Sequence, residues 1–269
     1  MSRIVLDIGD RLWLIGGTSE SVALAEAIAA VGIPCTVTVT TVAAESLYPK
    51  TPMLQVQVGR LDAADLEQFL QQRRIVAILD ASHPYAVEIS QMAIAAAAQQ
   101  QIPYLRFERL AIDARAENSK VISLDSFKTL LAGDYLYQQR VLLSVGYKAL
   151  PQFRSWQNHS TLFARILPAV ASLEAAIAAG FSSDRIIALR PPVPVELEKA
   201  LWRHWDISLV VTKASGMAGG EDVKRVVSAE LGIPLIVIDR PMVDYPQQTH
   251  DLAVALEFCR NHVSSRLSS

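Results

Sequence analysis

The residues best suited to chemistry lie where an apolar segment ends in two glycines and hydroxyl side chains follow. Residues 12–20 read Leu-Trp-Leu-Ile-Gly-Gly-Thr-Ser-Glu. Glycines let a backbone approach a pyrophosphate closely and adopt turn conformations that other residues avoid, and the N–H groups at the start of a helix attract anions. The segment is therefore a candidate phosphate-binding loop.

The spacing of this loop departs from the G-x-G-x-x-G pattern of dinucleotide-binding proteins. Thr18 and Ser21 stand where the second and third glycines would fall. An ordinary tight turn capped by Ser or Thr is the alternative interpretation. The next predicted strand, 33–40, ends in threonines and lacks the acid that binds an NAD ribose, which favours NADP. Threonine is also common in strands for packing reasons alone.

Two further segments place polar groups directly after predicted strands. Residues 80–85 read Asp-Ala-Ser-His-Pro-Tyr, and Pro84 suits the first turn of a helix that Ser82 or His83 would cap. His83 could donate a proton near neutral pH, and a capping role is the alternative. Residues 211–220 open from a strand into a glycine-rich loop behind Lys213, as in an anion cradle. It is not a Walker loop, because the lysine precedes the glycines.

Cationic side chains follow several of the predicted strands. Ligands of parallel sheets bind beyond the carboxyl ends of the strands. The cations therefore predict a small ligand with several carboxylates or phosphates in a cleft between two domains. Surface exposure, or pairing with acids such as Glu108 and Asp239, is the alternative. The cations are Arg106, Lys148, Arg165, Arg190, Lys213 and Arg240.

Strands and helices alternate along almost the whole chain, which predicts parallel sheets covered by helices on both faces. Eleven strands are more than one open sheet usually carries, so we expect two Rossmann-like α/β domains, 1–137 and 138–269, joined by a hinge at 133–139. The predicted strands are 12–16, 33–40, 54–58, 75–80, 102–106, 121–124, 140–145, 161–166, 185–189, 207–212 and 233–238. The predicted helices are 18–31, 62–72, 84–100, 125–133, 170–179, 195–204 and 221–231, and the apolar residues near 252–258 indicate one more.

Composition narrows the function classes. The 269 residues carry a net charge of −2, which argues against a general nucleic-acid binder. No apolar run reaches the roughly 18 residues of a membrane span, and the first ten residues do not form a signal pattern. Cys35 and Cys259 are too few and too far apart for a disulfide framework or a metal site. We expect a cytoplasmic protein without metal.

Taken together, these segments resemble the precorrin-6A reductases of cobalamin biosynthesis, from either the metal-free or the cobalt-containing pathway. The resemblance runs from Leu12 to Pro241 and departs from the family pattern at Arg190-Pro191-Pro192 and at 224–229. Each motif is weak alone, but their order is specific. The matching segments are 15–20, 58–62, 80–86, 103–109, 143–146, 212–216 and 238–241.

The resemblance implies a two-domain α/β enzyme that uses NADPH to reduce one double bond of a macrocycle. The first domain would bind NADP, and the second would contribute substrate contacts. The substrate would be a polycarboxylate tetrapyrrole receiving hydride at the C18=C19 unit, and other enzymes of the pathway would be candidate partners. The cofactor supplies the chemistry and the protein supplies position and field.

The resemblance also assigns residues to roles. The nicotinamide end would contact Ser82, His83 and Tyr85, with His83 the candidate catalytic residue, and the 2′-phosphate would contact Thr40 and Thr41. The rest of the dinucleotide would contact Gly16, Gly17, Thr18, Ser19 and Glu20. Substrate carboxylates, or the far side of the cofactor, would contact Arg106, Arg109, Lys213, Ser215 and Gly216.

Two other functions remain open from the sequence. A non-catalytic NADP sensor would keep the glycine loop and leave the cations unexplained. An NADP-dependent reductase of a smaller substrate is the second. A short-chain dehydrogenase would require Tyr-x-x-x-Lys on a helix, and that spacing is absent at Tyr85, Tyr104, Tyr135 and Tyr137.

Overall fold

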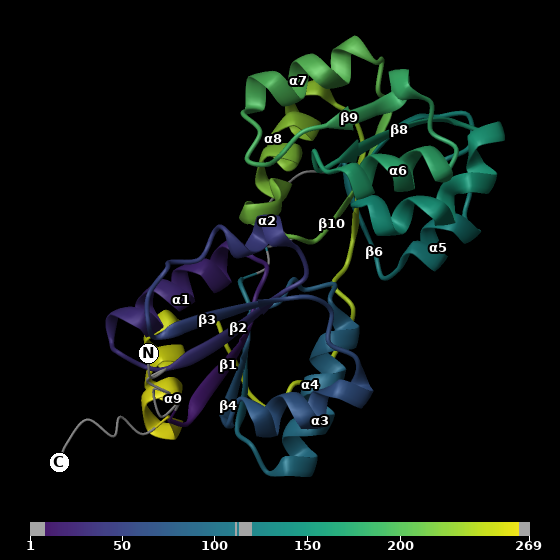
Figure 1. The fold of residues 1–269 in the computed structure, drawn as a ribbon. Coiled ribbons are helices and arrows are strands. Elements are labelled where there is room, and N and C mark those ends of the chain that lie inside the picture. Colours follow the sequence, from purple (N-terminus) through teal and green to yellow (C-terminus); the bar gives the residue numbers. More distant parts are fainter. Residues whose placement is uncertain (1–8, 111, 113–119, 264–269) are drawn as a thin grey trace. The chain divides into compact units, whose positions relative to one another are not determined.

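The computed structural model describes residues 9–110, 112 and 120–263, which form two compact units. The first unit combines the chain up to Arg109 with the chain from Met242 onward, and the second runs from Leu110 to Pro241. Figure 1 shows the elements of both units.

The first unit is built on a parallel sheet of six strands. The strand order is β12-β5-β4-β1-β2-β3, and every neighbouring pair is parallel. The chain leaves β1 toward β2 on one side and β4 toward β5 on the other, so the sheet has a topological switch point between β1 and β4. The strands are β1 (Arg11–Ile15), β2 (Cys35–Val39), β3 (Leu54–Val58), β4 (Ile75–Asp80), β5 (Tyr104–Phe107) and β12 (Gln248–Thr249).

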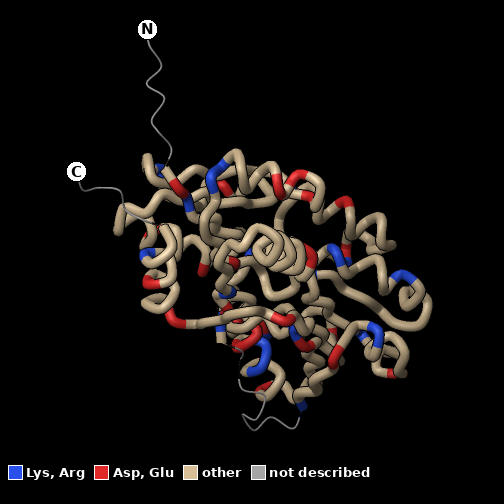
Figure 2. Tube along the Cα trace, turned by 90° about the horizontal axis from the view of Figure 1, so that it is seen from below, with Lys and Arg blue, Asp and Glu red and all other residues tan. Residues whose placement is uncertain are grey.

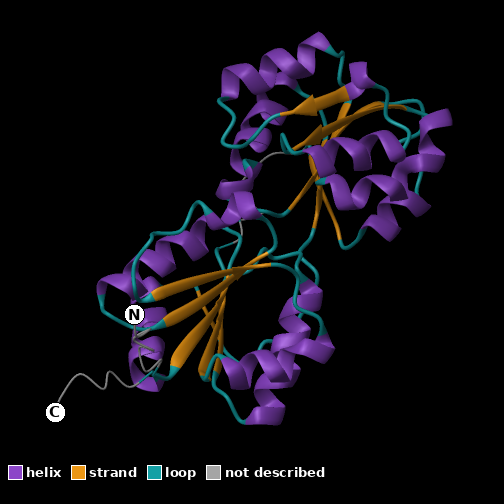
Figure 3. Ribbon diagram, in the orientation of Figure 1, coloured by secondary structure: helices purple, strands orange, loops and turns teal. Residues whose placement is uncertain are grey.

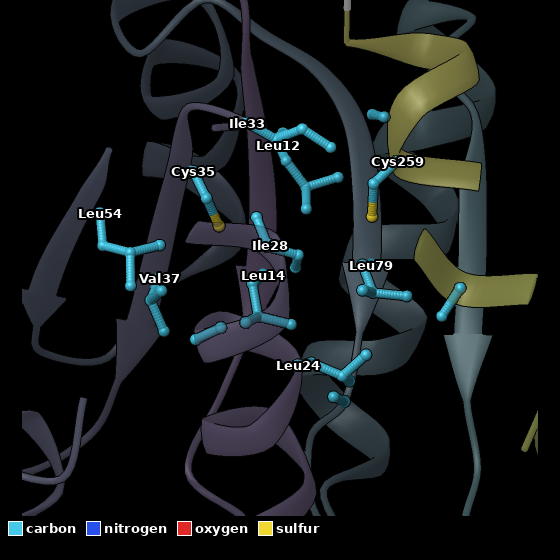
Figure 4. Close-up of a cluster of buried hydrophobic side chains, with 14 of the residues drawn as sticks. Leu12, Leu14, Leu24, Ile28, Ile33, Cys35, Val37, Leu54, Leu79 and Cys259 are labelled. Carbon is cyan, nitrogen blue, oxygen red and sulfur yellow. The ribbon is translucent and has the colours of Figure 1, made fainter. Parts of the chain in front are cut away.

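Helices cover both faces of this sheet, and each face has its own core (Figure 3). β1 and β2 are buried along their whole length, as expected for strands enclosed on two sides. One core includes Leu12, Leu14 and Cys35 together with Cys259 (Figure 4), and the other packs Trp13 against Phe69. The helices are α1 (Ser19–Ala30), α2 (Val42–Glu45), α3 (Ala63–Gln72), α4 (Val87–Gln100) and α9 (Leu252–His262).

The second unit repeats the order of five strands of the first sheet, but its remaining edge strand, β6, is the first strand of the unit in the chain, whereas β12 is the last of the first unit. Its six parallel strands follow the order β6-β11-β10-β7-β8-β9, so the switch point lies between β7 and β10. The strands are β6 (Val121–Leu124), β7 (Arg140–Ser144), β8 (Thr161–Ile166), β9 (Ile186–Ala188), β10 (Leu209–Lys213) and β11 (Leu235–Ile238). The helices are α5 (Phe127–Ala132), η1 (Tyr147–Asn158), α6 (Val170–Ala178), η2 (Ser183–Arg185), α7 (Val195–His204), η3 (Met217–Gly219) and α8 (Glu221–Leu231).

The predicted fold class is confirmed, and all eleven predicted strands are present. The predicted boundary at 137/138 is wrong, because the chain passes from one unit to the other at 109/110 and returns at 241/242. β6, predicted as a strand of the first domain, pairs with β11 of the second unit. The proposed hinge at 133–139 lies inside the second unit, where Leu136 is fully buried.

The C-terminal segment completes the first unit for a physical reason. β12 extends the first sheet beside β5, and α9 buries Ala255, Phe258 and Cys259 in the core over β1 and β4. The local sequence pattern of β12 and α9 is compatible with packing on either sheet. Only tertiary contacts decide which sheet they join.

The C-terminal helix should therefore stabilise the first unit and not the second. We expect Phe258→Ala to cost about 3 kcal/mol, because it removes a buried aromatic ring and leaves a cavity. Hydrogen exchange followed by mass spectrometry should show faster exchange in β1, β2 and β4, with β7 and β10 unchanged. Loss of protection in β7 and β10 alone would contradict this division of the chain.

Candidate functional site

The glycine loop after β1 requires both of its glycines, for different reasons. The Gly16 N–H donates to the Thr38 carbonyl at 2.9 Å, and a β-carbon at Gly16 would collide with the Tyr48 hydroxyl. Gly17 has φ +102°, a conformation that L-residues rarely adopt, and space around it is open. The loop thus presents bare backbone at the switch point of the first sheet.

Helix α1 begins directly after the loop with a reciprocal cap. The Thr18 hydroxyl accepts from the Ser21 N–H at 3.1 Å, and the Ser21 hydroxyl accepts from the Thr18 N–H at 3.0 Å. Within the described residues, the N–H groups of Ser19 and Glu20 have no hydrogen-bond acceptor. Two unpaired N–H groups at the start of a twelve-residue helix suit an anionic oxygen.

The Thr18 side chain also connects the loop to the end of β4. Its hydroxyl donates to the Ala81 carbonyl at 2.8 Å, and the Ala81 N–H donates to the Ile15 carbonyl at 3.0 Å. The two central strands therefore meet at their carboxyl ends, as the switch point requires.

Asp80, the last residue of β4, is a fully buried carboxylate that accepts four hydrogen bonds. Its Oδ1 accepts from the Ser82 N–H at 2.9 Å and from Arg106 Nη1 at 2.8 Å. Its Oδ2 accepts from the Ser90 hydroxyl at 2.6 Å and from the Tyr104 hydroxyl at 2.7 Å. Burial and the Asp80 charge raise the pKa of Tyr104, which keeps it a donor.

Arg106 was predicted to bind substrate carboxylates, and in the structure its guanidinium belongs to a buried network that borders a pocket. Its side chain is 1% exposed, and each guanidinium nitrogen donates at least one hydrogen bond. Nη1 donates to Asp80 and to the Ser82 hydroxyl, Nη2 to the Ser82 carbonyl, and Nε to Glu108, with which Nη2 also forms an ion pair. Burial opposes the charge, but Asp80 and Glu108 outweigh it and raise the pKa of Arg106.

The C-terminal segment contributes to the same cluster. The Arg106 guanidinium lies over the Tyr245 ring, 5.2 Å from its centroid. The backbone N–H of Arg106 donates to the Gln247 carbonyl. Burial raises the pKa of Tyr245. The buried ion pair is thus closed by residues from β4, β5 and the chain that returns after Pro241.

A small, open pocket lies beside this cluster, at the carboxyl ends of β1, β4 and β5. Arg109 and Glu20 face each other in it, with Arg109 Nη1 donating to Glu20 Oε1 at 3.0 Å. A residue predicted to bind substrate and one predicted to bind cofactor therefore pair with each other. The lining residues are Thr18, Glu20, Ala81, Ser82, Pro84, Arg106, Phe107, Glu108 and Arg109.

The segment after Asp80 differs from its prediction. Helix α4 begins at Val87, not at Pro84, and Ser82 and His83 do not cap it. A turn precedes the helix instead, in which the Ala86 N–H donates to the His83 carbonyl at 2.7 Å. His83 Nδ1 accepts from the Tyr85 N–H at 3.2 Å, and the His83 and Tyr85 rings lie 5.7 Å apart. Ser82 belongs to the Arg106 cluster and borders the pocket.

The two threonines predicted to bind a 2′-phosphate follow β2, next to the glycine loop. Thr40 and Thr41 are exposed. The Thr41 hydroxyl caps the short helix α2 by accepting from the Ala44 N–H at 3.2 Å. A hydroxyl that accepts a backbone N–H retains its own hydrogen for donation, so Thr41 keeps the capacity to bind a phosphate oxygen.

Lys213 ends β10 at the switch point of the second sheet. A β-carbon at Gly146, in the turn after β7, would lie 3.7 Å from Lys213 Nζ, so the lysine reaches over the neighbouring strand end. Burial and, to a smaller extent, the charge of Lys148 lower the pKa of Lys213 to about 8. An anion bound there would relieve both effects.

The glycine-rich loop after Lys213 is held by side chains of the helix that follows it. The buried Glu221 carboxylate accepts from the Gly216 N–H at 2.9 Å and from Arg225. The buried Lys224 ammonium donates to the Gly219 and Gly220 carbonyls, and burial lowers its pKa to about 7. The Gly216 N–H is thus already paired with a carboxylate.

Ser215 is also packed within the loop. It is buried, and a β-carbon at Gly219 would collide with its side chain. Gly216, with φ +69°, supplies the left-handed turn that the loop needs.

The six predicted cations divide into internal and surface groups. Arg165 is buried and pairs with Glu198 and the Ser144 hydroxyl, so, like Arg106, it serves an internal network. Lys148 and Arg190 are exposed, and Arg240 donates to the Ala214 carbonyl at 2.9 Å. Basic and acidic positions both recur along the trace in Figure 2.

Comparison with known proteins identifies the family. The model of the family described as "Precorrin-6x reductase CbiJ/CobK" matches residues 11–260. A cobalt-precorrin-6A reductase of Synechocystis is 49% identical over 94% of this chain and 97% of its own. A cobalt-precorrin-6A reductase of Priestia megaterium is 33% identical over 86% of this chain and 91% of its own. The chain belongs to the precorrin-6x reductase family.

A solved structure supports this assignment. The fold of a precorrin-6A reductase, CobK, superimposes with a TM-score of 0.76 at 25% identity, covering 94% of this chain and 97% of that one. The precorrin-6x reductases are oxidoreductases, and a reductase of this kind takes its electrons from a nicotinamide cofactor. The expected family and enzyme class are confirmed.

Several residues of this reductase that shape the sites were not predicted from sequence. The sequence does not indicate the hydrogen-bond partner of a distant hydroxyl group. Tyr48 contacts Gly17 across 31 positions, and Ser90, within α4, donates to Asp80. Glu221 and Lys224, at the start of α8, follow the glycine-rich loop closely in the sequence. This proximity was the one sequence signal that they contact the loop. The residues are Tyr48, Ser90, Tyr104, Tyr245 and Glu221, with Lys224 noted only as part of a helix.

The part of the reductase that the structure describes offers neither a candidate metal site nor a membrane-spanning helix. No group of three or more His, Cys, Asp or Glu in that part of the chain is arranged to hold a metal ion. No described helix has the length and apolarity needed to cross a membrane.

The buried pair in this reductase should contribute stability. We expect Arg106→Met to destabilise the first unit by about 3–5 kcal/mol, because Asp80 would stay buried without its counter-charge. Urea denaturation measures the change. Arg60→Met is the matched control, because the Arg60–Glu88 pair is exposed and should contribute less than about 1 kcal/mol. Equal losses in the two variants would contradict the internal role of Arg106.

Proposed function

We propose that this protein is an NADPH-dependent reductase of cobalt-precorrin-6A, with the metal-free macrocycle as the alternative substrate. The observation that carries the proposal is the bare glycine loop beside a pocket at the switch point of the first sheet, in a chain of this family. The relative at 49% identity is named for the cobalt-containing substrate, which supports that form.

The first unit fits a nicotinamide dinucleotide at its switch point. Gly16 and Gly17 leave room for a pyrophosphate, and the N–H groups of Ser19 and Glu20 would donate to its oxygens. Thr40 and Thr41 would bind the 2′-phosphate, which is the basis for NADPH over NADH. When bound, NADPH supplies the hydride.

The pocket between Thr18 and Arg109 suits the nicotinamide end of the cofactor. It lies at the switch point of the first sheet, directly beside the glycine loop and the start of α1. Ser82 borders it, and His83 and Tyr85 follow in the chain. Because His83 Nδ1 accepts a backbone N–H, its Nε2 carries the hydrogen, which makes that atom the candidate donor of a proton.

The second unit would contribute contacts to the substrate's carboxylates. Lys213 is the leading residue, because burial and Lys148 depress its pKa and an anion would restore its charge. Ser215 and Gly216 would shape the loop that carries it. Arg109 would reach a carboxylate only by exchanging its pairing with Glu20. Other enzymes of the pathway stay candidate partners.

The cysteines agree with a reducing compartment, and we propose the cytoplasm. Cys35 and Cys259 are free and buried, and burial raises the pKa of both thiols, to about 12 for Cys259. A protonated, buried thiol is inert toward oxidation.

The activity itself is tested with purified protein, NADPH and cobalt-precorrin-6A or precorrin-6A. We expect loss of NADPH absorbance coupled to a change in the macrocycle's spectrum, and faster turnover of the cobalt form. Gly17→Val should abolish NADPH binding with the fold retained, because valine is strained at φ +102° and covers the open backbone.

Each result points to a different conclusion. Binding of NADPH without turnover of either macrocycle would favour a sensor. Oxidation only in the presence of a small carbonyl compound would favour the smaller-substrate reductase. Unchanged affinity in Gly17→Val would remove the loop from the cofactor site.

Lys213 should impose a pH limit on substrate capture. A lysine with a pKa of about 8 is cationic below that pH and loses its charge above it. We therefore expect kcat/KM for the macrocycle to fall as the pH rises through about 8, since this parameter reports the free enzyme. In Lys213→Arg the side chain stays charged, so the fall should disappear from this range. Lys148→Met should move it to higher pH, and identical profiles in all three proteins would rule out Lys213.

A further inference from the structure

The loop after β1 keeps its shape although two of the three glycines of the usual fingerprint are replaced by hydroxyl residues. Thr18 and Ser21 cap each other, and the Ser21 hydroxyl also donates to the Thr18 carbonyl at 2.7 Å. These bonds fix the start of α1. They leave the preceding residue, Gly17, to be held by something outside the loop.

Tyr48 holds Gly17. It lies between α2 and β3, is 4% exposed, and its hydroxyl accepts from the Gly17 N–H at 2.8 Å. The same hydroxyl lies 2.6 Å from the Ser21 hydroxyl. Because the single hydrogen of Ser21 is directed to the Thr18 carbonyl, the hydrogen between the two hydroxyls comes from Tyr48. Burial raises the pKa of Tyr48, which keeps that hydrogen in place.

The tyrosine also explains the absence of a side chain at Gly16. A β-carbon at Gly16 would collide with the Tyr48 hydroxyl. The hydroxyl therefore occupies the space beneath the loop, and one atom contacts Gly16, Gly17 and Ser21. A structural element outside the β1–α1 connection thus sets the backbone of that connection.

We propose that Tyr48 is the positioning residue of the dinucleotide loop, acting through Gly17 and Ser21 in place of the missing glycines. This inference rests on the proposed function. Its chemical consequence is that the Gly17 N–H is committed to Tyr48 and does not bind the pyrophosphate. The N–H groups of Ser19 and Glu20, the first two residues of α1, would then bind the phosphate oxygens.

Tyr48→Phe tests the inference with the least disturbance, because it removes one oxygen. We expect the Kd for NADPH, measured by calorimetry, to rise about fivefold, the effect of one lost hydrogen bond. The KM for NADPH should rise in parallel, with kcat and the KM for the macrocycle unchanged. Ser21→Ala removes the partner of the same hydroxyl and should weaken NADPH binding without adding to the effect of Tyr48→Phe. Tyr137→Phe is the matched control, since Tyr137 is 52% exposed in the second unit, and it should leave all parameters unchanged.

Gly16→Ala, made in the wild type and in Tyr48→Phe, gives a second measurement. In the wild type the new methyl group meets the Tyr48 hydroxyl, and NADPH affinity should fall. In Tyr48→Phe the obstructing oxygen is gone, so the same substitution should cost less, with a remainder from the Thr38 carbonyl 3.2 Å away. Circular dichroism shows that each variant is folded.

The outcomes separate the two proposals. Absence of NADPH binding by the wild type would overturn the proposed function. Tight binding by the wild type with an unchanged Kd in Tyr48→Phe, or costs of Gly16→Ala that are equal in the two backgrounds, would overturn the role of Tyr48 alone. A loss of kcat with no change in NADPH affinity would do the same.

Discussion

The buried charge of Asp80 is the constraint around which the first unit is organised. A carboxylate with no exposure at the end of a central strand is unstable unless every lone pair is directed at a donor. Its donors come from β5, α4 and the backbone after β4, and the Arg106 that neutralises it is in turn covered by Tyr245. The cluster therefore ties the returning C-terminal segment to the strand end where the pocket opens.

The two units share the order of five of their six strands, and the loops at their switch points carry different polar groups. At the first switch point the polar groups are hydroxyls and backbone N–H groups, supported by a tyrosine below. At the second they are charges, with Glu221 and Lys224 holding the glycine-rich loop from the helix that follows. A narrow loop with open backbone suits a pyrophosphate, whereas a loop carrying a partly desolvated lysine suits a carboxylate. Closely similar topologies thus carry two strand-end loops with different polar groups.

Much of this could be predicted from the sequence, because alternation of β-branched runs and helical periods is a local signal. Every predicted strand exists, and both loops flagged for their glycines lie at switch points. The domain boundary could not be predicted, since β6 and α9 carry no local mark of the sheet they join. The start of α4 was missed because Pro84 is as compatible with the turn at 83–86 as with a first helical turn. Tyr48 was missed because its contact spans 31 residues and involves one oxygen atom.

The cations show most clearly why position in sequence does not settle role. Arg106 and Arg165 follow their strands just as Lys213 does, yet both are buried beside carboxylates that neutralise them. Moving either guanidinium to a substrate carboxylate would cost free energy, because Asp80 or Glu198 would stay buried without its counter-charge. Lys213 has different electrostatics: burial and the charge of Lys148 lower its pKa to about 8. An anionic group nearby would favour its charged form, which is why Lys213 is the cation that we propose to contact a substrate carboxylate.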